Sequence, residues 1–201
     1  MQNVVIPAAR FLLGLARPSK ATNTRLLRER GETAASLVIR EPAAADIPAL
    51  AQLHVTTWNA TYGGLLMTGP PVAIRESQWR EAFATADGSW FCFVVEGRDG
   101  LVGFAKGTRD ADPSAGQLSK IYLLRDYQRV GLGRRLVGHV TRRFIGQGVS
   151  TMSSYVDARN PSCAFYEALS AKWLVEANGA VNQSWYVWRN LPKLAAMCPV
   201  E

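Results

Sequence analysis

Residues 117–145, QLSKIYLLRDYQRVGLGRRLVGHVTRRFI, predict a strand, a short loop and a helix. The loop runs from Arg125 to Val130, and the helix opens at Gly131-Leu132-Gly133. Apolar residues recur along the helix at the spacing that places them on one face, which predicts packing against a sheet. These residues are Leu132, Leu136, Val137, Val140 and Phe144, and the strand's own apolar residues are Leu118, Ile121, Leu123 and Leu124.

The two glycines at the start of this helix are typical of an anion site. Glycine lets a ligand approach the backbone closely. The first N–H groups of a helix have no partner within it, and the helix dipole is positive at that end. Arg129 and Arg134 flank the turn. A glycine-rich turn that binds nothing explains the glycines equally well, so both interpretations stand at this point.

A dinucleotide-binding fold is a second alternative, because Gly131-x-Gly133 matches the first half of G-x-G-x-x-G. The third glycine is replaced by Leu136, and six residues separate Leu124 from Gly131. In a dinucleotide fold the turn follows the strand directly. The pattern therefore disfavours this class.

The rest of the chain predicts a mixed α/β sheet without internal repeats. His54 falls on the apolar face of the helix that follows Asp46, a position more typical of a hydrogen-bonded core histidine than of a catalytic base. Asn160 and Pro161 are expected to cap and open a later helix. Strands are expected at 37–40, 90–95, 101–105, 117–124, 151–156, 172–177 and 184–189, and further helices after Asp46, at 72–86 and after Asn160.

Three motifs resemble those of the GCN5-related N-acetyltransferase (GNAT) family over about residues 37–190. The loop Gln128-Arg129-Val130-Gly131-Leu132-Gly133 is similar to the family's acyl-CoA signature, Gln/Arg-x-x-Gly-x-Gly/Ala after a strand. Residues 156–169 resemble its second signature, in which an Asn precedes a helix carrying Phe-Tyr. The spacing of His54, Trp58 and Tyr62 also resembles many members.

The resemblance implies a GNAT fold with a central, mostly antiparallel sheet flanked by helices. It also implies that acetyl-CoA is the co-substrate, that an amine accepts the acetyl group, and that transfer is direct in a ternary complex. Backbone N–H groups from Gln128 to Arg134 would hold the pyrophosphate, and Asn160 would contact the pantetheine or sulphur region. The main chain at Ile121, Tyr122 and Leu123 would pair with the pantetheine, and the Leu123 N–H would meet the thioester oxygen.

Tyr166 stands where the family places the general acid for the departing thiolate. A phenol of pKa about 10 is a weaker acid than a thiol of about 8.5, so complete proton transfer would be uphill by about 2 kcal/mol. Hydrogen bonding to the thiolate and simple packing of Tyr166 are the alternatives. Trp58 and Tyr62 would line the acceptor cleft or, alternatively, pack the helix junction.

Gln117 is the main departure from the family pattern, because many relatives carry a glutamate there as the base. Deprotonating a lysine-type amine of pKa about 10.4 at pH 7 costs about 4.6 kcal/mol, against about 1.4 kcal/mol for an α-amine near 8. The hypothesis is a preference for amines of low pKa, or a base elsewhere. A non-catalytic acyl-CoA-binding or regulatory module is the alternative function.

Composition sets the remaining expectations. The chain has 201 residues and a net charge of +7, and its three cysteines show no metal-ligand spacing, so no metal is expected. No apolar run reaches the length of a membrane span. We expect a cytoplasmic enzyme acting on a small-molecule or peptide amine, with neither nucleic acid nor membrane as partner; a homodimer is one state the resemblance allows. The expected division is an N-terminal extension or dimer arm at 1–36, the acetyltransferase domain at 37–192 and a tail at 193–201.

Overall fold

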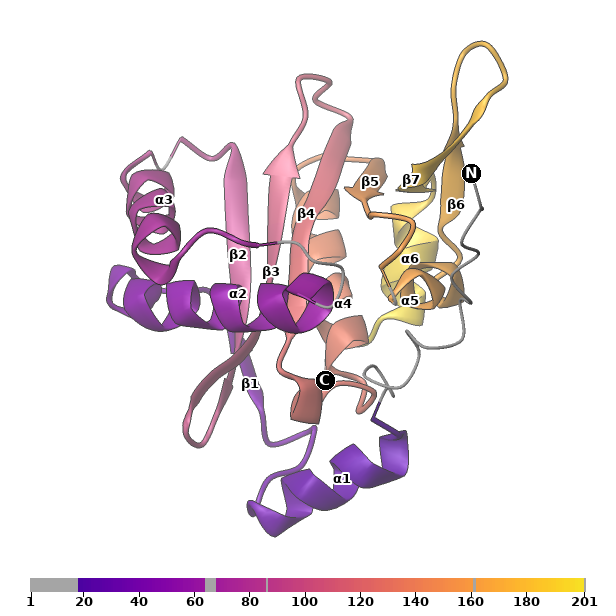
Figure 1. Ribbon diagram of the computed structural model, residues 1–201. Helices are drawn as coiled ribbons and strands as arrows, with labels where there is room; N and C mark the ends of the chain where they lie inside the picture. Colours follow the sequence, from indigo (N-terminus) through magenta and orange to yellow (C-terminus); the bar gives the residue numbers. More distant parts are fainter. Residues whose placement is uncertain (1–17, 64–67, 86, 161, 201) are drawn as a thin grey trace, which may run out of the picture.

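A seven-stranded sheet forms the centre of the computed structural model, which describes residues 18–63, 68–85, 87–160 and 162–200 (Figure 1). The strand order is β1-β2-β3-β4-β5-β7-β6. All neighbours are antiparallel except β4 and β5, which run parallel. The mixed α/β sheet predicted from the sequence is thereby confirmed. The strands are β1 (Val38–Arg40), β2 (Trp90–Gly97), β3 (Gly100–Arg109), β4 (Ala115–Leu123), β5 (Thr151–Tyr155), β6 (Lys172–Val175) and β7 (Val181–Trp188).

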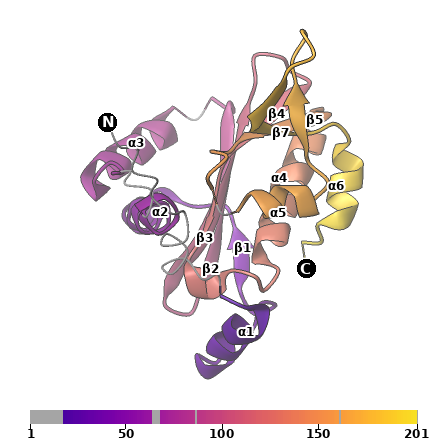
Figure 2. The same ribbon diagram turned by 45° about the vertical axis from the view of Figure 1, so that its right-hand side comes forward.

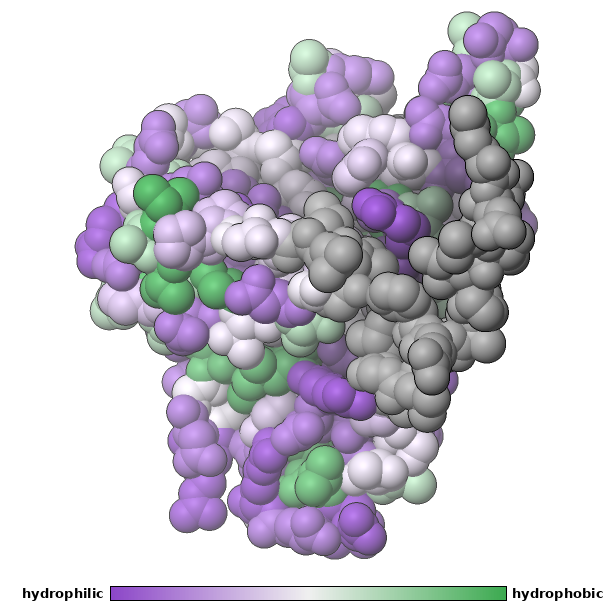
Figure 3. Space-filling model, viewed as in Figure 1, coloured by the Kyte–Doolittle hydropathy of each residue, from purple (hydrophilic) through white to green (hydrophobic). Residues whose placement is uncertain are grey.

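Helices cover both faces of the sheet (Figure 2). One face carries α2 (Ile47–Tyr62) and α3 (Val72–Ala84), and the other carries α4 (Leu132–Gly146), α5 (Cys163–Ala168) and α6 (Leu191–Met197). Helix α1 (Lys20–Glu29) lies at one end of the sheet, beside the loop that follows β4 (Figure 1). None of the helices in the described ranges combines the length and the apolar character needed to cross a membrane. On the face seen in Figure 3, hydrophobic residues form small patches between hydrophilic ones.

The side chains of β2 show that both faces of the sheet are buried. Phe91, Phe93 and Val95 point into the core beneath α4, whereas Cys92 and Val94 point into the core beneath α2 and α3. Successive side chains of a strand point to opposite faces, so a strand covered on both sides reads as a continuous apolar run. This is the pattern that the sequence of residues 90–95 shows.

Strands β4 and β5 pair over a short distance and then separate. Their register extends only from Ala115 to Gln117 on β4, and beyond it the Ser154 hydroxyl donates to the Leu118 carbonyl over 3.0 Å. On the other side β4 stays paired with β3 as far as Leu123. The Leu124 N–H donates to Val102 O, and residues of an antiparallel pair alternate between bonded and unbonded positions. The main-chain groups of Leu123 and Ile121 therefore face the gap, and those of Tyr122 face β3.

Both ends of the chain pack more closely than the sequence suggested. Asn23 and Leu27 of α1 are buried, within the stretch expected to be an extension. In the expected tail, α6 packs on α4 so tightly that a Cβ atom at Gly138 would collide with the backbone of Cys198. The domain boundaries at 36 and 192 stay a prediction, and residues 1–17 lie outside the described residues.

The start of α5 differs from the prediction. The helix begins at Cys163 with Ser162 as the preceding residue, not at Asn160-Pro161. The Asn160 side-chain oxygen accepts the Ser162 N–H over 2.8 Å, so Asn160 caps a turn before the helix. Position 161 lies outside the described residues. The connection between β3 and β4 is short, because β3 extends to Arg109 and β4 begins at Ala115.

Ser170 ends α5 in a left-handed conformation, with a φ of 61°. The Ser170 N–H donates to Glu167 O and the Ala171 N–H to Tyr166 O, which is the arrangement that normally places glycine at this position. This conformation costs a non-glycine residue about 1–2 kcal/mol. Glycine avoids that cost, but it also stabilises the unfolded chain by about 0.4–1 kcal/mol through its greater conformational entropy. We expect Ser170→Gly to raise the free energy of unfolding by about 0.5–1 kcal/mol, measured by urea denaturation.

The matched control is Ser77→Gly, at an exposed position inside α3, where glycine should lower the unfolding free energy by about 0.5–1 kcal/mol. A Ser170→Gly protein no more stable than the native chain would contradict the assignment of strain to this cap.

Candidate functional site

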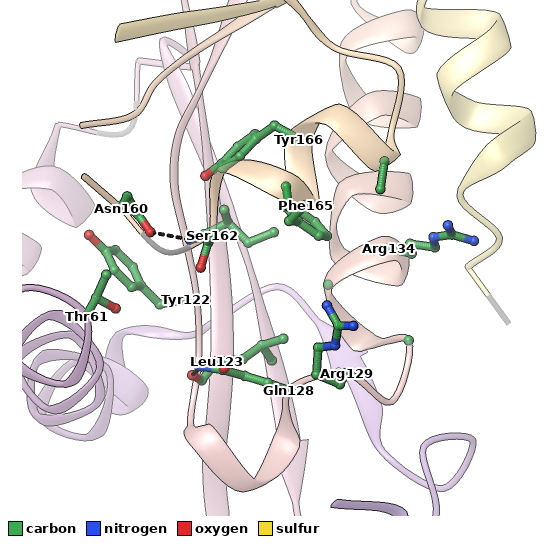
Figure 4. A pocket seen from close by; sticks show the side chains of 15 residues that line it. Thr61, Tyr122, Leu123, Gln128, Arg129, Arg134, Asn160, Ser162, Phe165 and Tyr166 are labelled. Carbon is green, nitrogen blue, oxygen red and sulfur yellow. Dashed lines mark hydrogen bonds between the residues drawn. The ribbon is translucent and has the colours of Figure 1, made fainter. Parts of the chain in front are cut away.

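The gap between β4 and β5 opens into a cavity of about 390 Å³. β4 forms one wall, the turn at the start of α4 another, and α5 with the residues before it a third (Figure 4). The residues predicted for the site that line this cavity are Ile121, Tyr122, Leu123, Gln128, Arg129, Gly131, Gly133, Arg134, Asn160 and Tyr166. Sequence analysis missed Thr61, Ser162, Ala164, Phe165 and Ala168, which complete the lining.

The turn before α4 presents a row of unbonded backbone N–H groups. The Gln128 N–H donates to Arg125 O, and the Arg134 N–H donates to Gly131 O. Between them, the N–H groups of residues 129–133 have no hydrogen-bond partner within the described ranges. Within the predicted series from Gln128 to Arg134, the N–H groups available to a ligand are therefore those of residues 129–133. Because these groups lie at a helix N-terminus, where the dipole is positive, the turn is suited to hold an anion.

Two left-handed residues give the turn its shape. Gly131 has a φ of 98° and Arg129 a φ of 65°. Successive N–H groups of a chain that alternates conformation in this way converge on one concave side. Gly133 serves a different purpose, since a Cβ atom there would lie 3.1 Å from the Phe165 ring. The second glycine therefore allows α4 and α5 to approach each other. Val130 and Leu132 do not line the cavity with their side chains, and Leu132 is fully buried in the core.

Gln128 ties the turn to the end of β4. Its side-chain amide donates to the Leu123 carbonyl over 3.0 Å. That carbonyl faces the gap, so the Leu123 N–H faces the same way. The signature glutamine thus fixes the strand end whose N–H points into the cavity.

Helix α1 supports the same loop from outside. The Asn23 amide donates to the carbonyls of Arg125 and Gln128, each over 2.8 Å, and Asn23 is fully buried. Glu32 adds a second support, because its carboxylate accepts the Tyr127 hydroxyl over 2.9 Å and the Arg98 N–H over 2.6 Å. Sequence analysis did not identify these residues, since nothing local to Asn23 or Glu32 indicates a partner about a hundred residues away.

Tyr166 is buried on α5 and lines the cavity. Its ring stacks on Tyr186 with centroids 5.3 Å apart. Burial raises the pKa of Tyr166 well above its usual range, against a smaller opposite effect of the hydrogen bond with Ser154. The phenol is therefore a weaker acid than free tyrosine, and it keeps its proton at neutral pH.

Asn160 joins the two sides of the site. Its amide donates to the Tyr62 hydroxyl over 2.9 Å, so it connects α5 to the end of α2. Tyr62 and Trp58 pack on each other with ring centroids 5.2 Å apart. Neither residue lines the cavity; the residue of α2 that does is Thr61. Their predicted role in acceptor binding stays a prediction.

His54 is buried beside the cavity wall and not part of it. Its ring lies 5.6 Å from that of Tyr122 and 5.2 Å from that of Phe104. Burial, followed by the charges of Arg75, Lys120 and Lys106, lowers the pKa of His54 to about 3. The imidazole is neutral, and its Nδ1 has no hydrogen-bond partner in the described residues. It is buried like the core histidine that the sequence favoured, but without the hydrogen bond expected of one. In the described part of the chain, no group of three or more His, Cys, Asp or Glu side chains is arranged to hold a metal ion.

The chain matches known proteins over most of this structure. The family described as the acetyltransferase (GNAT) family matches residues 49–170, which is more than half of the chain. The uncharacterized N-acetyltransferase YuaI of Bacillus subtilis (strain 168) is 26% identical over 145 residues, covering 71% of this chain and 84% of that protein.

Solved structures share the fold at lower identity. The PaiA N-acetyltransferase of Thermoplasma acidophilum, solved in complex with coenzyme A, superposes with a TM-score of 0.62 at 18% identity, covering 76% of this chain and 96% of that one. A phosphinothricin acetyltransferase of Sinorhizobium meliloti, solved in complex with AcCoA, gives a TM-score of 0.56 at 19% identity, covering 77% and 88%. These likenesses establish the fold.

The contacts of Asn23 generate a prediction about the loop. Asn23→Ala leaves two loop carbonyls without their donor, which costs about 1–3 kcal/mol for buried polar groups. We expect a loss of unfolding free energy in that range and faster amide hydrogen exchange at residues 125–131. Asn59→Ala, at an exposed position of α2, is the control. It should change the free energy of unfolding by no more than about 0.5 kcal/mol and leave amide hydrogen exchange at residues 125–131 as it is in the native protein. Unchanged exchange in the loop would show that α1 does not hold it.

Proposed function

This chain belongs to the GNAT family of acetyltransferases, and from that premise we propose that it moves the acetyl group of acetyl-CoA to a primary amine. The observation that carries the proposal is the row of unbonded N–H groups at residues 129–133, next to a strand whose main chain is free to pair. The first supports phosphate binding and the second supports the binding of an extended pantetheine. The amine belongs to a small molecule or a peptide.

The cofactor would bind along the cavity in two parts. The pyrophosphate takes the N–H groups of residues 129–133, with Arg129 and Arg134 beside it as exposed cations. The pantetheine lies along β4, where the main-chain groups of Ile121 and Leu123 replace the missing partner strand. Tyr122 contributes its side chain, since its main chain is used by β3. Asn160 borders the sulphur end of this path.

The reaction is direct transfer. The amine nitrogen forms a bond with the thioester carbon, the carbon–sulphur bond breaks, the sulphur leaves as a thiolate, and the proton that the nitrogen loses passes to solvent water. The Leu123 N–H donates to the thioester oxygen, on which negative charge develops. Tyr166 donates a hydrogen bond to the sulphur; its raised pKa makes complete proton transfer more unfavourable than for free tyrosine. This favours thiolate stabilisation over the general-acid role that the resemblance implied.

The amine must reach the thioester without its proton. Gln117, on β4, carries a carboxamide, which cannot accept a proton at neutral pH. Neither His54 nor Cys163 is among the residues that line the cavity. The preference for amines of low pKa therefore remains part of the proposal. The alternative, a non-catalytic acyl-CoA-binding module, predicts acetyl-CoA binding with no release of CoA in the presence of amines.

Cofactor binding is tested by calorimetry with acetyl-CoA. Arg134→Glu replaces a cation at the proposed pyrophosphate site without disturbing the left-handed residues of the turn, and it should weaken binding at least about tenfold, as expected for the loss of a charged hydrogen bond. Arg189→Glu makes the same change of charge at an exposed position away from the cavity and should leave affinity within about twofold. A native protein that does not bind acetyl-CoA would overturn the proposed function.

The role of Tyr166 is tested by Tyr166→Phe. Removing the hydroxyl keeps the ring stack on Tyr186 and should lower kcat by about 10- to 100-fold, the value of one hydrogen bond to a charged group, with acetyl-CoA affinity within about threefold. Tyr186→Phe is the matched control, because its hydroxyl bonds Glu167 at 3.0 Å and does not line the cavity. Equal kcat values for the two variants would assign Tyr166 to packing.

A further inference from the structure

We propose that the acceptor amine carries an anionic group, a carboxylate or a phosphate, which binds among Lys106, Lys120 and Arg75. The inference rests on the proposed function and specifies its substrate class. It concerns the opposite face of the sheet from α4, where β3 and β4 lie beneath α2 and α3. We call these three residues the cationic cluster.

The register of β3 and β4 places two of the cations side by side. Lys106 and Lys120 are directly paired across the strands. The ladder is irregular between Lys106 and Gly107, where Ser119 is left over; its hydroxyl donates to the Lys106 carbonyl over 3.1 Å. Like charges directly opposite each other on one face of an antiparallel pair destabilise it. A ligand of opposite charge would offset that cost.

No carboxylate in the described ranges neutralises the cluster. Its members make no ion pair there, whereas Arg30, Arg40, Arg80 and Arg143 each have an acidic partner. The Lys106 ammonium lies instead over aromatic rings, 4.7 Å from the centroid of Trp90 and 5.5 Å from that of Trp79. The Arg75 guanidinium donates to the Gln78 side-chain oxygen, and within the described residues its buried Nε has no hydrogen-bond partner.

The groups that face Lys120 from the surrounding elements are neutral or positive. They are Lys106 and Cys92 from the sheet, Arg75 from α3, the neutral His54 from α2, and the Tyr122 phenol. Burial, then the charges of Lys106 and Arg75, lower the pKa of Lys120 to about 8. A bound anion would favour the charged ammonium and raise that pKa. Lys106, Lys120 and Arg75 are all partly exposed, so a solute can reach them.

The cluster lies at a suitable distance from the reaction centre. Lys120 is three residues before Leu123 on β4, about 10 Å along the strand. Tyr122 lies between them in the strand. Its ring centroid is 5.6 Å from that of His54, and the residue also lines the cavity. An amine beside the Leu123 N–H and an anion at the lysine side chains are therefore separated by the length of a small molecule.

The test uses pairs of amines that differ only in the anion: an amino acid with its amide, and phosphoethanolamine with ethanolamine. Binding to the CoA-loaded protein is measured by calorimetry, and kcat/KM is measured with acetyl-CoA. We expect the native protein to prefer the anionic member of at least one pair by about tenfold or more. Loss of the anion lowers the pKa of the amine, so amine basicity alone would favour the neutral member.

Variants assign the preference to the cluster. Lys120→Gln and Lys106→Gln should each reduce the anionic preference to about threefold or less while leaving CoA affinity unchanged, and Lys193→Gln, an exposed lysine of α6, should leave it intact. The preference of the native protein should also decline between pH 7 and 9, as Lys120 loses its proton.

Three outcomes separate the possibilities. CoA binding with equal use of both members of every pair overturns the anionic acceptor and leaves the proposed function intact. A preference that survives both lysine substitutions also overturns it. Absence of CoA binding by the native protein overturns the proposed function itself, and with it this inference.

Discussion

The separation of β4 from β5 after Gln117 is the constraint on which the rest of the structure depends. A parallel neighbour that continued to Leu123 would bond the main-chain groups of Ile121 and Leu123 and close the cavity. Instead the backbone register ends at Gln117, and the Ser154 hydroxyl donates to the Leu118 carbonyl beyond it. The result is an open edge of β4 with helices on both faces of the sheet beside it. The edge is therefore available to a ligand and protected from pairing with other chains.

The strained turn before α4 needs support, because Arg129 occupies a left-handed conformation without being glycine. That support comes from both sides. Gln128 fixes the turn to Leu123 from within, and Asn23 holds two of its carbonyls from α1. A turn held in this way presents its N–H groups before any ligand arrives, which lowers the ordering cost of binding. Helix α1 is therefore connected to the proposed cofactor end of the site, although it precedes the matched family region.

Local patterns in the sequence were sufficient for the sheet, for α4 and for the turn at Gly131, because each of these depends on periodicity or on a short motif. They were not sufficient for the start of α5, where the Asn160 side chain caps a turn and not the helix itself. The contacts of Asn23 join residues that are separated by 102 and 105 positions in the sequence, so they leave no local signal. The pairing of Lys106 with Lys120 depends on a register shift in β3 and β4, and a shift of one residue changes which side chains share a face.

The cations at the two ends of the proposed site differ in exposure, and the difference fits what each end is proposed to bind. At the proposed cofactor end Arg129 and Arg134 are exposed, and the N–H groups of residues 129–133 are the proposed contacts to the pyrophosphate. At the proposed acceptor end the cations are half-buried, where an unpaired charge is costly, and burial together with the charges of Lys106 and Arg75 lowers the pKa of Lys120 to about 8. An anion bound beside Lys120 would favour the charged ammonium and raise that pKa, so binding of the anion and protonation of Lys120 would reinforce each other. The cost of placing three cations together would thus be lowest in the proposed complex, where their charge would select an anionic acceptor.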